Sequence, residues 1–362
     1  MTTIEAFAKT CKFEAPDRIV TYDLVKNNQL LKEFGGTDKD IVVRNAQMMK
    51  AIGLDSTRTL LNPEHYYAKR KLDIWVELFG VDPSGWEVVV DEGTAWFTKR
   101  PFANVKELEK HLPKMPDKEQ VKAWYKERFK RTREVFAEHD LVWVSCVEGP
   151  LTDAHSYTDF GLFFDTMMEA PEIVDYLMDV FTEYQLACSE AHAEDPSSPV
   201  FFICDDIAGS NGIMFSPTWL SEKLFPRLKK IYQPARERGL KCCYHSDGNI
   251  DRVLDTLVHD VKIDGLNPIE PFAGMDIRKV RASYPNLLLF GNVCVVNTLT
   301  RGKVADVERD VKGLLKDIAP SGGFFLGSST EVDDSMPAEN ILAMYRTAKK
   351  FGKYPIDLTA LA

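Results

Sequence analysis

The chain has 362 residues and a formal net charge of −10, and these values exclude several classes of protein. Hydrophobic residues make up 44% and charged residues 28%, which is typical of a globular protein and unlike a disordered one. An acidic chain lacks the dense basic surface that phosphate backbones require, so we expect no nucleic-acid partner. No stretch approaches the roughly 18 consecutive apolar residues of a membrane span, so we expect no membrane partner.

The first residues and the cysteines both indicate a cytoplasmic protein. The segment from Met1 to Lys9 has neither a basic region nor an apolar core, so the sequence predicts no signal peptide. Seven cysteines are an odd number for a disulfide framework, and Cys204 and Cys294 lie in apolar runs where a free thiol packs as a small hydrophobe. We therefore expect a reducing, cytoplasmic environment.

The first 115 residues show little regular pattern, and we expect this N-terminal part to be largely irregular. Two elements stand out within it. Residues 39–51 carry apolar residues at helical spacing and end before Gly53, which predicts a helix. Residues 85–98 contain two strand-like runs joined at Asp91-Glu92-Gly93, which predicts a β-hairpin.

Between residues 116 and 355, short apolar strands alternate with helices, which predicts a parallel sheet covered by helices. At least six strands are visible, and two weaker ones, around Ile19 and from Arg58 to Leu61, make eight. We therefore predict a (β/α)8 TIM barrel with an N-terminal extension and hairpin, in a single domain of residues 1–362. No glycine-rich fingerprint follows a strand, which disfavours a dinucleotide-binding sheet. The clearer strands begin at Leu141, Val200, Leu240, Gly265, Leu287 and Gly323, and the main helices span about 117–139, 217–238, 303–317 and 337–351.

The ends of these strands are unusually polar. In a TIM barrel the chemistry lies at the C-terminal ends of the strands, and side chains alternate along each strand. We therefore expect several carboxylates, one histidine and several cysteines to surround one cavity. The strand ends are Cys146 to Glu148, Cys204 to Asp206, His245 to Gly248, Asn267 to Glu270, Asn292 to Cys294 and Gly327 to Ser329.

Each of these residue types also has a structural alternative. An aspartate after a strand often caps the next helix, and this alternative stays open for Asp205, Asp206 and Asp247. The cysteines are expected to pack rather than react. His245 is expected to be functional, because only histidine has an unperturbed pKa close to neutrality. Tyr22 and Tyr66 lie near strand ends or early loops, where they would line an apolar pocket.

Several motifs occur together at these strand ends: Asp205-Asp206, Gly212 to Pro217, His245 to Gly248, Gly265 to Pro271, Gly291 to Val293, Gly322-Gly323 and Pro337 to Ile341. As a set, over about residues 85–355, they resemble the uroporphyrinogen decarboxylase superfamily. That superfamily contains decarboxylases and corrinoid-dependent methyltransferases, and the resemblance implies a TIM barrel.

The resemblance favours the methyltransferase branch. Decarboxylases of this superfamily carry an Arg-Gln-Ala-Gly-Arg segment that binds propionate carboxylates, whereas this chain has Arg44-Asn45-Ala46. An acidic chain with an acidic cavity also lacks the cations that a porphyrinogen needs. Members that methylate thiols have a zinc site of His-x-Cys and a distant Cys. Here Asp247 and the Ser328-Ser329 pair occupy those positions, which argues against zinc of that type.

The resemblance therefore implies an enzyme that moves a methyl group from a small donor to cob(I)alamin on a separate corrinoid protein. We expect a neutral aromatic methyl ether as donor, with His245 as the acid that protonates the leaving oxygen. A metal held by His245 and Asp247 is the competing route, and zinc is one candidate. The alternatives are a decarboxylase and a methyltransferase for methylamines or quaternary amines. The expected catalytic residues are His245, Asp206, Asp247 and Glu148, and the expected substrate-binding residues are Tyr22, Tyr66, Asp205, Asn267, Glu270, Asn292 and Cys294.

Overall fold

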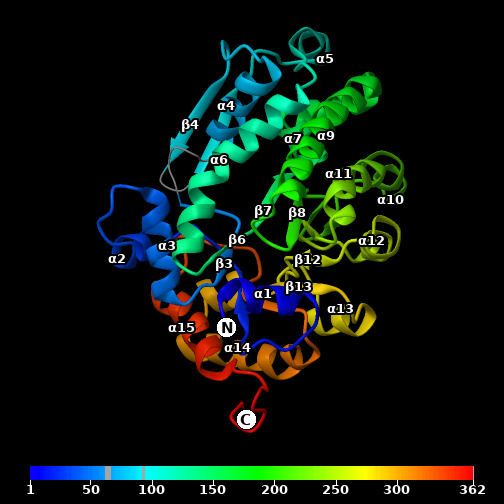
Figure 1. The fold of residues 1–362 in the computed structure, drawn as a ribbon. Coiled ribbons are helices and arrows are strands. Elements are labelled where there is room, and N and C mark those ends of the chain that lie inside the picture. Colours follow the sequence, from blue (N-terminus) through cyan, green and yellow to red (C-terminus); the bar gives the residue numbers. More distant parts are fainter. Residues whose placement is uncertain (62–66, 92–93, 362) are drawn as a thin grey trace.

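The computed structural model describes residues 1–61, 67–91 and 94–361. Its centre is a ring of parallel strands, and helices surround the ring (Figure 1). The strands of the ring are β1 (Val20–Thr21), β3 (Ser56–Thr57), β6 (Val142–Trp143) continued by β7 (Ser145–Glu148), β8 (Val200–Cys204), β11 (Lys241–His245), β12 (Gly265–Asn267), β13 (Leu288–Val293) and β14 (Phe324–Ser328).

Backbone pairing closes this ring. Seven strands form one sheet in the order β1-β14-β13-β12-β11-β8-β7, and each neighbouring pair is parallel. Tyr22, just after β1, bridges to Ser56 of β3, and β3 pairs with β6. Only Val144 separates β6 from β7, so the eighth strand joins the two edges. The prediction of a TIM barrel is confirmed.

Alternation along the strands divides the core into two clusters. Inward-facing residues such as Phe202, Phe290 and Phe325 fill the barrel, and the Phe290 and Phe325 rings stack with centroids 4.3 Å apart. The helix α1 (Thr3–Cys11) joins this inner cluster through Phe7, whose ring centroid lies 4.6 Å from that of Phe325. The N-terminal helix therefore packs into the barrel near the end at which its strands begin.

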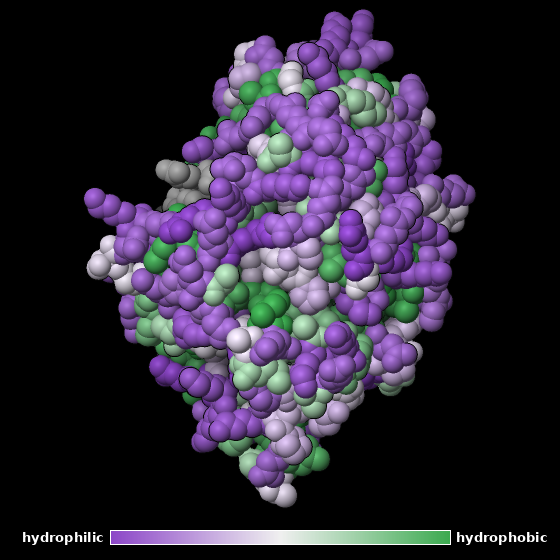
Figure 2. Space-filling view, in the orientation of Figure 1, coloured by the Kyte–Doolittle hydropathy of each residue, from purple (hydrophilic) through white to green (hydrophobic). Residues whose placement is uncertain are grey.

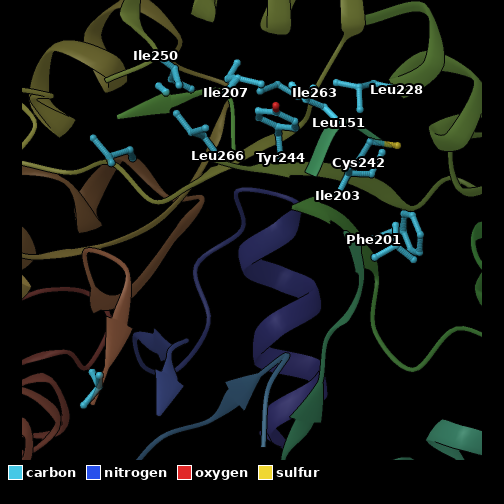
Figure 3. Close-up of a cluster of buried hydrophobic side chains, with 14 of the residues drawn as sticks. Leu151, Phe201, Ile203, Ile207, Leu228, Cys242, Tyr244, Ile250, Ile263 and Leu266 are labelled. Atoms are coloured by element: carbon cyan, nitrogen blue, oxygen red, sulfur yellow. The ribbon is translucent and has the colours of Figure 1, made fainter. Parts of the chain in front are cut away.

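Outward-facing residues of the same strands pack against the surrounding helices. Figure 3 shows part of this outer cluster, in which Phe201 and Ile203 of β8 lie near Cys242 and Tyr244 of β11. The side chains of Phe202 and Cys204, which alternate with them, belong to the inner cluster instead. The continuous apolar runs of these strands are explained by this burial on both faces.

The long helices lie where the sequence places them. The helix α3 (Ile41–Ile52) begins after Asp40, whose carboxylate accepts the Val42 amide, and ends at Gly53 with a left-handed φ of 90°. The other helices around or beside the barrel are α6 (Lys118–Glu138), α7 (Pro150–Thr158), α8 (Phe160–Glu169), α9 (Pro171–Glu194), α10 (Pro217–Trp219), α11 (Phe225–Glu237), α12 (Asp251–Thr256), α13 (Ile277–Ser283), α14 (Val304–Asp317) and α15 (Ala338–Phe351).

The N-terminal part differs from the expectation of an irregular segment. It supplies two barrel strands and four helices of seven residues or more, namely α1, α2 (Asn28–Phe34), α3 and α4 (Tyr67–Phe79). The second barrel strand ends just before Arg58 rather than containing it, so Arg58 is itself a strand-end residue. The short elements here are β2 (Leu24–Val25), α5 (Val105–Leu108), and, later in the chain, β9 (Ala208–Gly209), β10 (Gly212–Ile213) and β15 (Glu331–Val332).

The predicted hairpin is present as β4 (Glu87–Asp91) and β5 (Thr94–Lys99), which pair antiparallel. It packs on α4, where the Trp75 ring lies 5.3 Å from Trp86 and 5.2 Å from Phe97 between centroids. Together with α6, these elements stand over one end of the barrel (Figure 1). They form the cover of the cavity described below.

The face of the molecule in Figure 2 is mostly hydrophilic, with hydrophobic side chains in smaller patches. Within the three described ranges, no helix combines the length and the apolar character needed to cross a membrane.

Candidate active site

A cavity of about 420 Å³ lies where the barrel strands end and α4 and α6 cover them. The strand ends contribute Cys146, Glu148, Cys204, Asp206, His245 and Asp247 to its wall. The opposite wall comes from α4 and α6 and is rich in rings, among them Trp75, Trp124, Tyr125 and Phe129. Four of the residues predicted to be catalytic, namely Glu148, Asp206, His245 and Asp247, are thus brought to one space.

His245 has a fixed orientation and tautomer. The carboxamide of Asn267 donates from Nδ2 to the Phe290 carbonyl, so its Oδ1 faces the imidazole and can only accept. His245 Nδ1 lies 2.8 Å from that Oδ1 and therefore carries the proton. His245 Nε2 is left as an acceptor, and it points toward the carboxylates of the cavity.

Two carboxylates face this nitrogen. Oδ1 of Asp247 lies 3.7 Å from Nε2 of His245 and accepts a 2.8 Å hydrogen bond from the Thr330 hydroxyl. Asp206 accepts the backbone amide of Asp247 at 3.0 Å, which places the two carboxylates side by side. Burial raises the pKa of both carboxyl groups, and for Asp206 the charge of Asp247 adds to the effect.

This arrangement suits a proton or a cation at its centre. One ligand atom each from Asp206, His245 and Asp247 lie within 4.8 Å of one another. Three acceptors that face a common point repel one another unless a proton or a metal ion lies between them. An imidazole and two carboxylates are a donor set that divalent metals accept, and Asn267 would orient the imidazole as an outer partner.

The structure changes the role that we expected for His245. Burial, followed by the charge of Arg58, lowers the pKa of His245 to about 4. The imidazole is therefore neutral near pH 7, and its single N–H is directed at Asn267 rather than into the cavity. The geometry favours His245 as a ligand or acceptor, and it favours Asp206 or Asp247 as the group that holds a proton.

The expectation of an acidic cavity is wrong. The wall carries six basic and five acidic side chains, and several form ion pairs, such as Arg70 with Glu148 at 3.2 Å and the buried pair Lys71 with Asp153. The acidic net charge of the chain therefore does not describe its interior. The basic residues of the wall are Lys26, Arg58, Arg70, Lys71, Arg128 and Arg131, and the acidic ones are Glu148, Asp153, Asp206, Asp247 and Glu331.

Asp205 lies beneath the cavity and holds a helix. Its carboxylate accepts the Thr152 amide at 2.7 Å and the Leu151 amide at 3.4 Å, at the start of α7. The side chain is fully buried, and burial raises its pKa to about 8. Asp205 therefore acts as a helix cap, as the structural alternative expected. The helix that it caps is α7, which follows β7, whereas Asp205 itself follows β8.

The other predicted substrate-binding residues lie around the cavity rather than on its described wall. Glu270 accepts the Gly248 amide, and Asn292 donates to the Ile269 carbonyl at 3.0 Å. Cys294 accepts the Asn297 amide at the start of the next helical turn. Their roles in substrate binding stay predictions. Tyr22 and Asn267 are buried behind the wall, where Tyr22 contacts Arg58 and Asn267 contacts both Arg58 and His245. Tyr66 lies outside the described residues.

Many of the residues that line the cavity were missed by the sequence reasoning, among them Arg58, Arg70 and Glu331. Arg58 was taken as part of a strand, although the apolar run that follows it is not one. Glu331 lies shortly after β14, so the rule that chemistry gathers after barrel strands would have included it.

Comparison with known proteins agrees with this architecture. The sequence model of uroporphyrinogen decarboxylase (URO-D) matches residues 74–351, which is well over half of the chain. The chain belongs to the uroporphyrinogen decarboxylase family. A search of curated proteins returned no match.

A solved structure with the same fold is a methyltransferase from Methanosarcina mazei. It superposes with a TM-score of 0.70 at 18% sequence identity, over 97% of this chain and 99% of that one. At this identity the likeness concerns the fold. The sequence Arg44-Asn45-Ala46 occupies the place where we expected the Arg-Gln-Ala-Gly-Arg segment of the decarboxylases, which this chain lacks. It lies in α3, and none of the three is among the described residues that line the cavity.

Proposed function

We propose that this member of the uroporphyrinogen decarboxylase family is a methyltransferase that moves a methyl group from an aromatic methyl ether to cob(I)alamin on a separate corrinoid protein. The observation that carries the proposal is the cluster of Asp206, His245 and Asp247 in a cavity walled by aromatic rings. The name of the structural neighbour, a methyltransferase, supports the same reaction class.

The chemical difficulty in such a reaction is the leaving group. The bond between methyl carbon and ether oxygen breaks, the methyl goes to cobalt(I), whose electron pair forms the new bond, and the oxygen leaves as a phenolate that must be neutralised. Asp206 and Asp247 suit this task, because burial raises the pKa of both carboxyl groups and one proton can be retained between them. A positioned acid typically contributes about 10²–10⁴-fold to the rate.

The same residues fit a divalent metal, with zinc as one candidate. His245 Nε2, Asp206 and Asp247 would hold it, Asn267 would fix the imidazole and Thr330 would fix Asp247. When bound, such a metal would act as a Lewis acid on the leaving oxygen. In one mechanism a metal ion neutralises the phenolate, and in the other a proton does so. Both mechanisms use the same three side chains.

The aromatic wall supports an aromatic donor. Trp124 and Phe129 of α6 line the cavity and are partly exposed, whereas Trp75 and Tyr125, which also line it, are almost fully buried. Flat rings stack on one another and hold a planar substrate in a narrow range of orientations. A fixed ring would keep the methyl group in line for transfer, which is where much of the rate of such reactions originates.

Decarboxylation remains the second candidate, and one observation favours it. The cavity wall carries six basic side chains, and one of them, Arg58, has no carboxylate within 4 Å among the described residues, so a substrate carboxylate can bind there.

A substrate panel separates these functions. Methoxyphenols, methoxybenzoates, methylamines, quaternary amines and uroporphyrinogen are each incubated anaerobically with the protein and a reduced corrinoid acceptor. The proposal expects demethylation of an aromatic ether that depends on the corrinoid. Release of carbon dioxide from uroporphyrinogen without any corrinoid would contradict the proposal. If only amines react, the protein is still a methyltransferase, but its methyl donor is an amine rather than an aromatic ether.

A further inference from the structure

Arg58 differs from most of the other cations of the cavity. Arg70, Lys71, Lys26 and Arg131 form ion pairs with carboxylates of the chain. Among the described residues, no carboxylate lies within 4 Å of the Arg58 guanidinium, whose hydrogen bonds go to neutral oxygens. A partly buried arginine without an anion is an unusual arrangement, because charge is costly to desolvate.

The neighbours of Arg58 hold it in place and use only one of its nitrogens. Nη1 donates to the Tyr22 hydroxyl and, at 3.0 Å, to Asn267 Oδ1. The guanidinium carbon lies 5.4 Å from the centroid of the Phe202 ring. These contacts fix the plane of the group, which reduces the entropy lost when it binds a ligand.

The remaining nitrogens of Arg58 are available to a ligand. Within the described part of the chain, Nε and Nη2 have no hydrogen-bond acceptor, and neither is enclosed by protein atoms. Arg58 lines the cavity, so this edge of the guanidinium opens into it. Two parallel N–H groups along one edge match the two oxygens of a carboxylate.

This edge is coupled to the reaction site. Asn267 Oδ1 accepts from Arg58 Nη1 at 3.0 Å and from His245 Nδ1 at 2.8 Å. One amide oxygen therefore sets the position of the guanidinium and of the imidazole together. A ligand bound to Arg58 would therefore lie in the same cavity as Asp206 and Asp247.

We propose that Arg58 binds a carboxylate of the methyl donor through Nε and Nη2, so that the substrate is a methoxylated aromatic acid rather than a neutral ether. This inference rests on the proposed function for the reaction itself, but carboxylate binding by Arg58 is measurable without it. Arg58 then acts as the specificity-determining residue of the cavity.

The test compares a carboxylate with its neutral isostere. Binding of 3- and 4-methoxybenzoate and of the corresponding methoxybenzamides to the complete chain is measured by calorimetry, with no corrinoid present. We expect at least one benzoate to bind about 10- to 100-fold more tightly than its amide, as charge-assisted hydrogen bonds imply. Arg58→Gln should remove this preference and leave amide binding within about threefold.

Arg131→Gln is the matched control, since it removes another cavity arginine whose guanidinium is bound by Asp40 at 2.8 Å. This variant should keep the preference for the carboxylate. Circular dichroism checks that both variants fold, and if Arg58→Gln does not fold, the comparison in the wild type and Arg58→Lys still decides. Arg58→Lys should keep part of the preference, because it retains the charge but loses the fork of donors.

Three outcomes overturn the inference: wild-type protein that binds neither benzoate, equal affinity for acid and amide, and a preference that survives in Arg58→Gln. If the proposed function is wrong but the carboxylate inference is right, the benzoate binds through Arg58, but no methyl group reaches a reduced corrinoid. Conversely, demethylation of a neutral methoxyphenol alone would support the function and refute the carboxylate anchor.

Discussion

A chain of three side chains, Arg58, Asn267 and His245, determines the chemistry of the site at the scale of single residues. The Asn267 amide accepts from both neighbours, so His245 keeps its proton on Nδ1 and offers Nε2 to Asp206 and Asp247. Burial and the nearby guanidinium keep this imidazole neutral, with its pKa lowered to about 4. His245 is therefore suited to hold a cation or a shared proton, and poorly suited to donate one.

We predict that His245→Ala lowers methyl transfer by at least about 10²-fold, because it removes the imidazole ligand or acceptor of the cluster. The side chain is 6% exposed and lies at the end of β11, so the fold should survive. Steady-state rates and near-ultraviolet circular dichroism of the variant check this. A folded variant with nearly wild-type rates would return His245 to a packing role.

The next prediction concerns Asn267, which accepts the Nδ1 proton of His245. Asn267→Leu removes the acceptor of the Nδ1 proton, and we expect it to weaken divalent metal binding by about 10- to 100-fold. Asn267→Asp retains an acceptor at this position and serves as the matched control. Metal titration followed by calorimetry measures both. Equal affinity in the two variants would show that Asn267 does not orient the imidazole.

The sequence predicts that a residue belongs to the cavity only when the residue lies at the end of a clearly recognisable strand. Asp206, His245 and Asp247 follow two long apolar strands, so alternation and the strand-end rule place them correctly in the cavity. Arg58 follows a strand of only two residues, Ser56–Thr57, which leaves no periodic signal. Its role also depends on Asn267, more than 200 positions later in the chain, and no local pattern reports such a contact.

At the scale of elements, α7 shows how one strand end supports the next. The N-cap position of α7 is Gly149, and a Cβ added there would lie 1.9 Å from the Asp205 carboxyl carbon. Asp205 of the neighbouring strand therefore takes the place of a local cap and accepts the Leu151 and Thr152 amides. This arrangement ties β8 to the helix that borders the cavity.

We predict that Asp205→Ala destabilises the protein by about 1–3 kcal/mol, because two buried amides lose their acceptor. Asp205→Asn should cost less, since its amide oxygen still accepts the Thr152 N–H. Chemical denaturation with circular dichroism measures both values. An alanine variant as stable as the wild type would mean that α7 does not depend on Asp205.

The regular elements were predictable and the N-terminal ones were not. Helices such as α6 and α15 carry a long amphipathic pattern, and β8 and β11 are continuous apolar runs, so the sequence marks them. The first two barrel strands have two residues each, and the barrel holds them through pairing with β14 and β6. Their structure comes from tertiary contacts that the local sequence does not encode.

At the scale of the whole molecule, the cavity requires both halves of the chain. The barrel supplies the carboxylates and His245, whereas α4 and α6 supply the rings and several of the cations. The interior is therefore balanced in charge although the chain carries −10 overall.

Metal content is a property of this assembled site. We predict that any bound divalent metal is held by His245 and carboxylates, in at most one ion per chain, and is removed by a chelator. Elemental analysis before and after dialysis against chelator, with His245→Ala as the control, measures this. A metal that resists chelation and persists in the His245→Ala variant would place the ion elsewhere.

The central claim, methyl transfer at the Asp206, His245 and Asp247 cluster, is tested most directly by one spectroscopic measurement. The purified chain is mixed anaerobically with cob(I)alamin and an aromatic methyl ether, either a methoxyphenol or a methoxybenzoate, and the cobalamin spectrum is followed. The account predicts conversion to methylcobalamin with one phenol formed per cobalt, and a rate at least about 10²-fold lower in His245→Ala. Sustained demethylation without any cobalamin, or an unchanged rate in the variant, would contradict it.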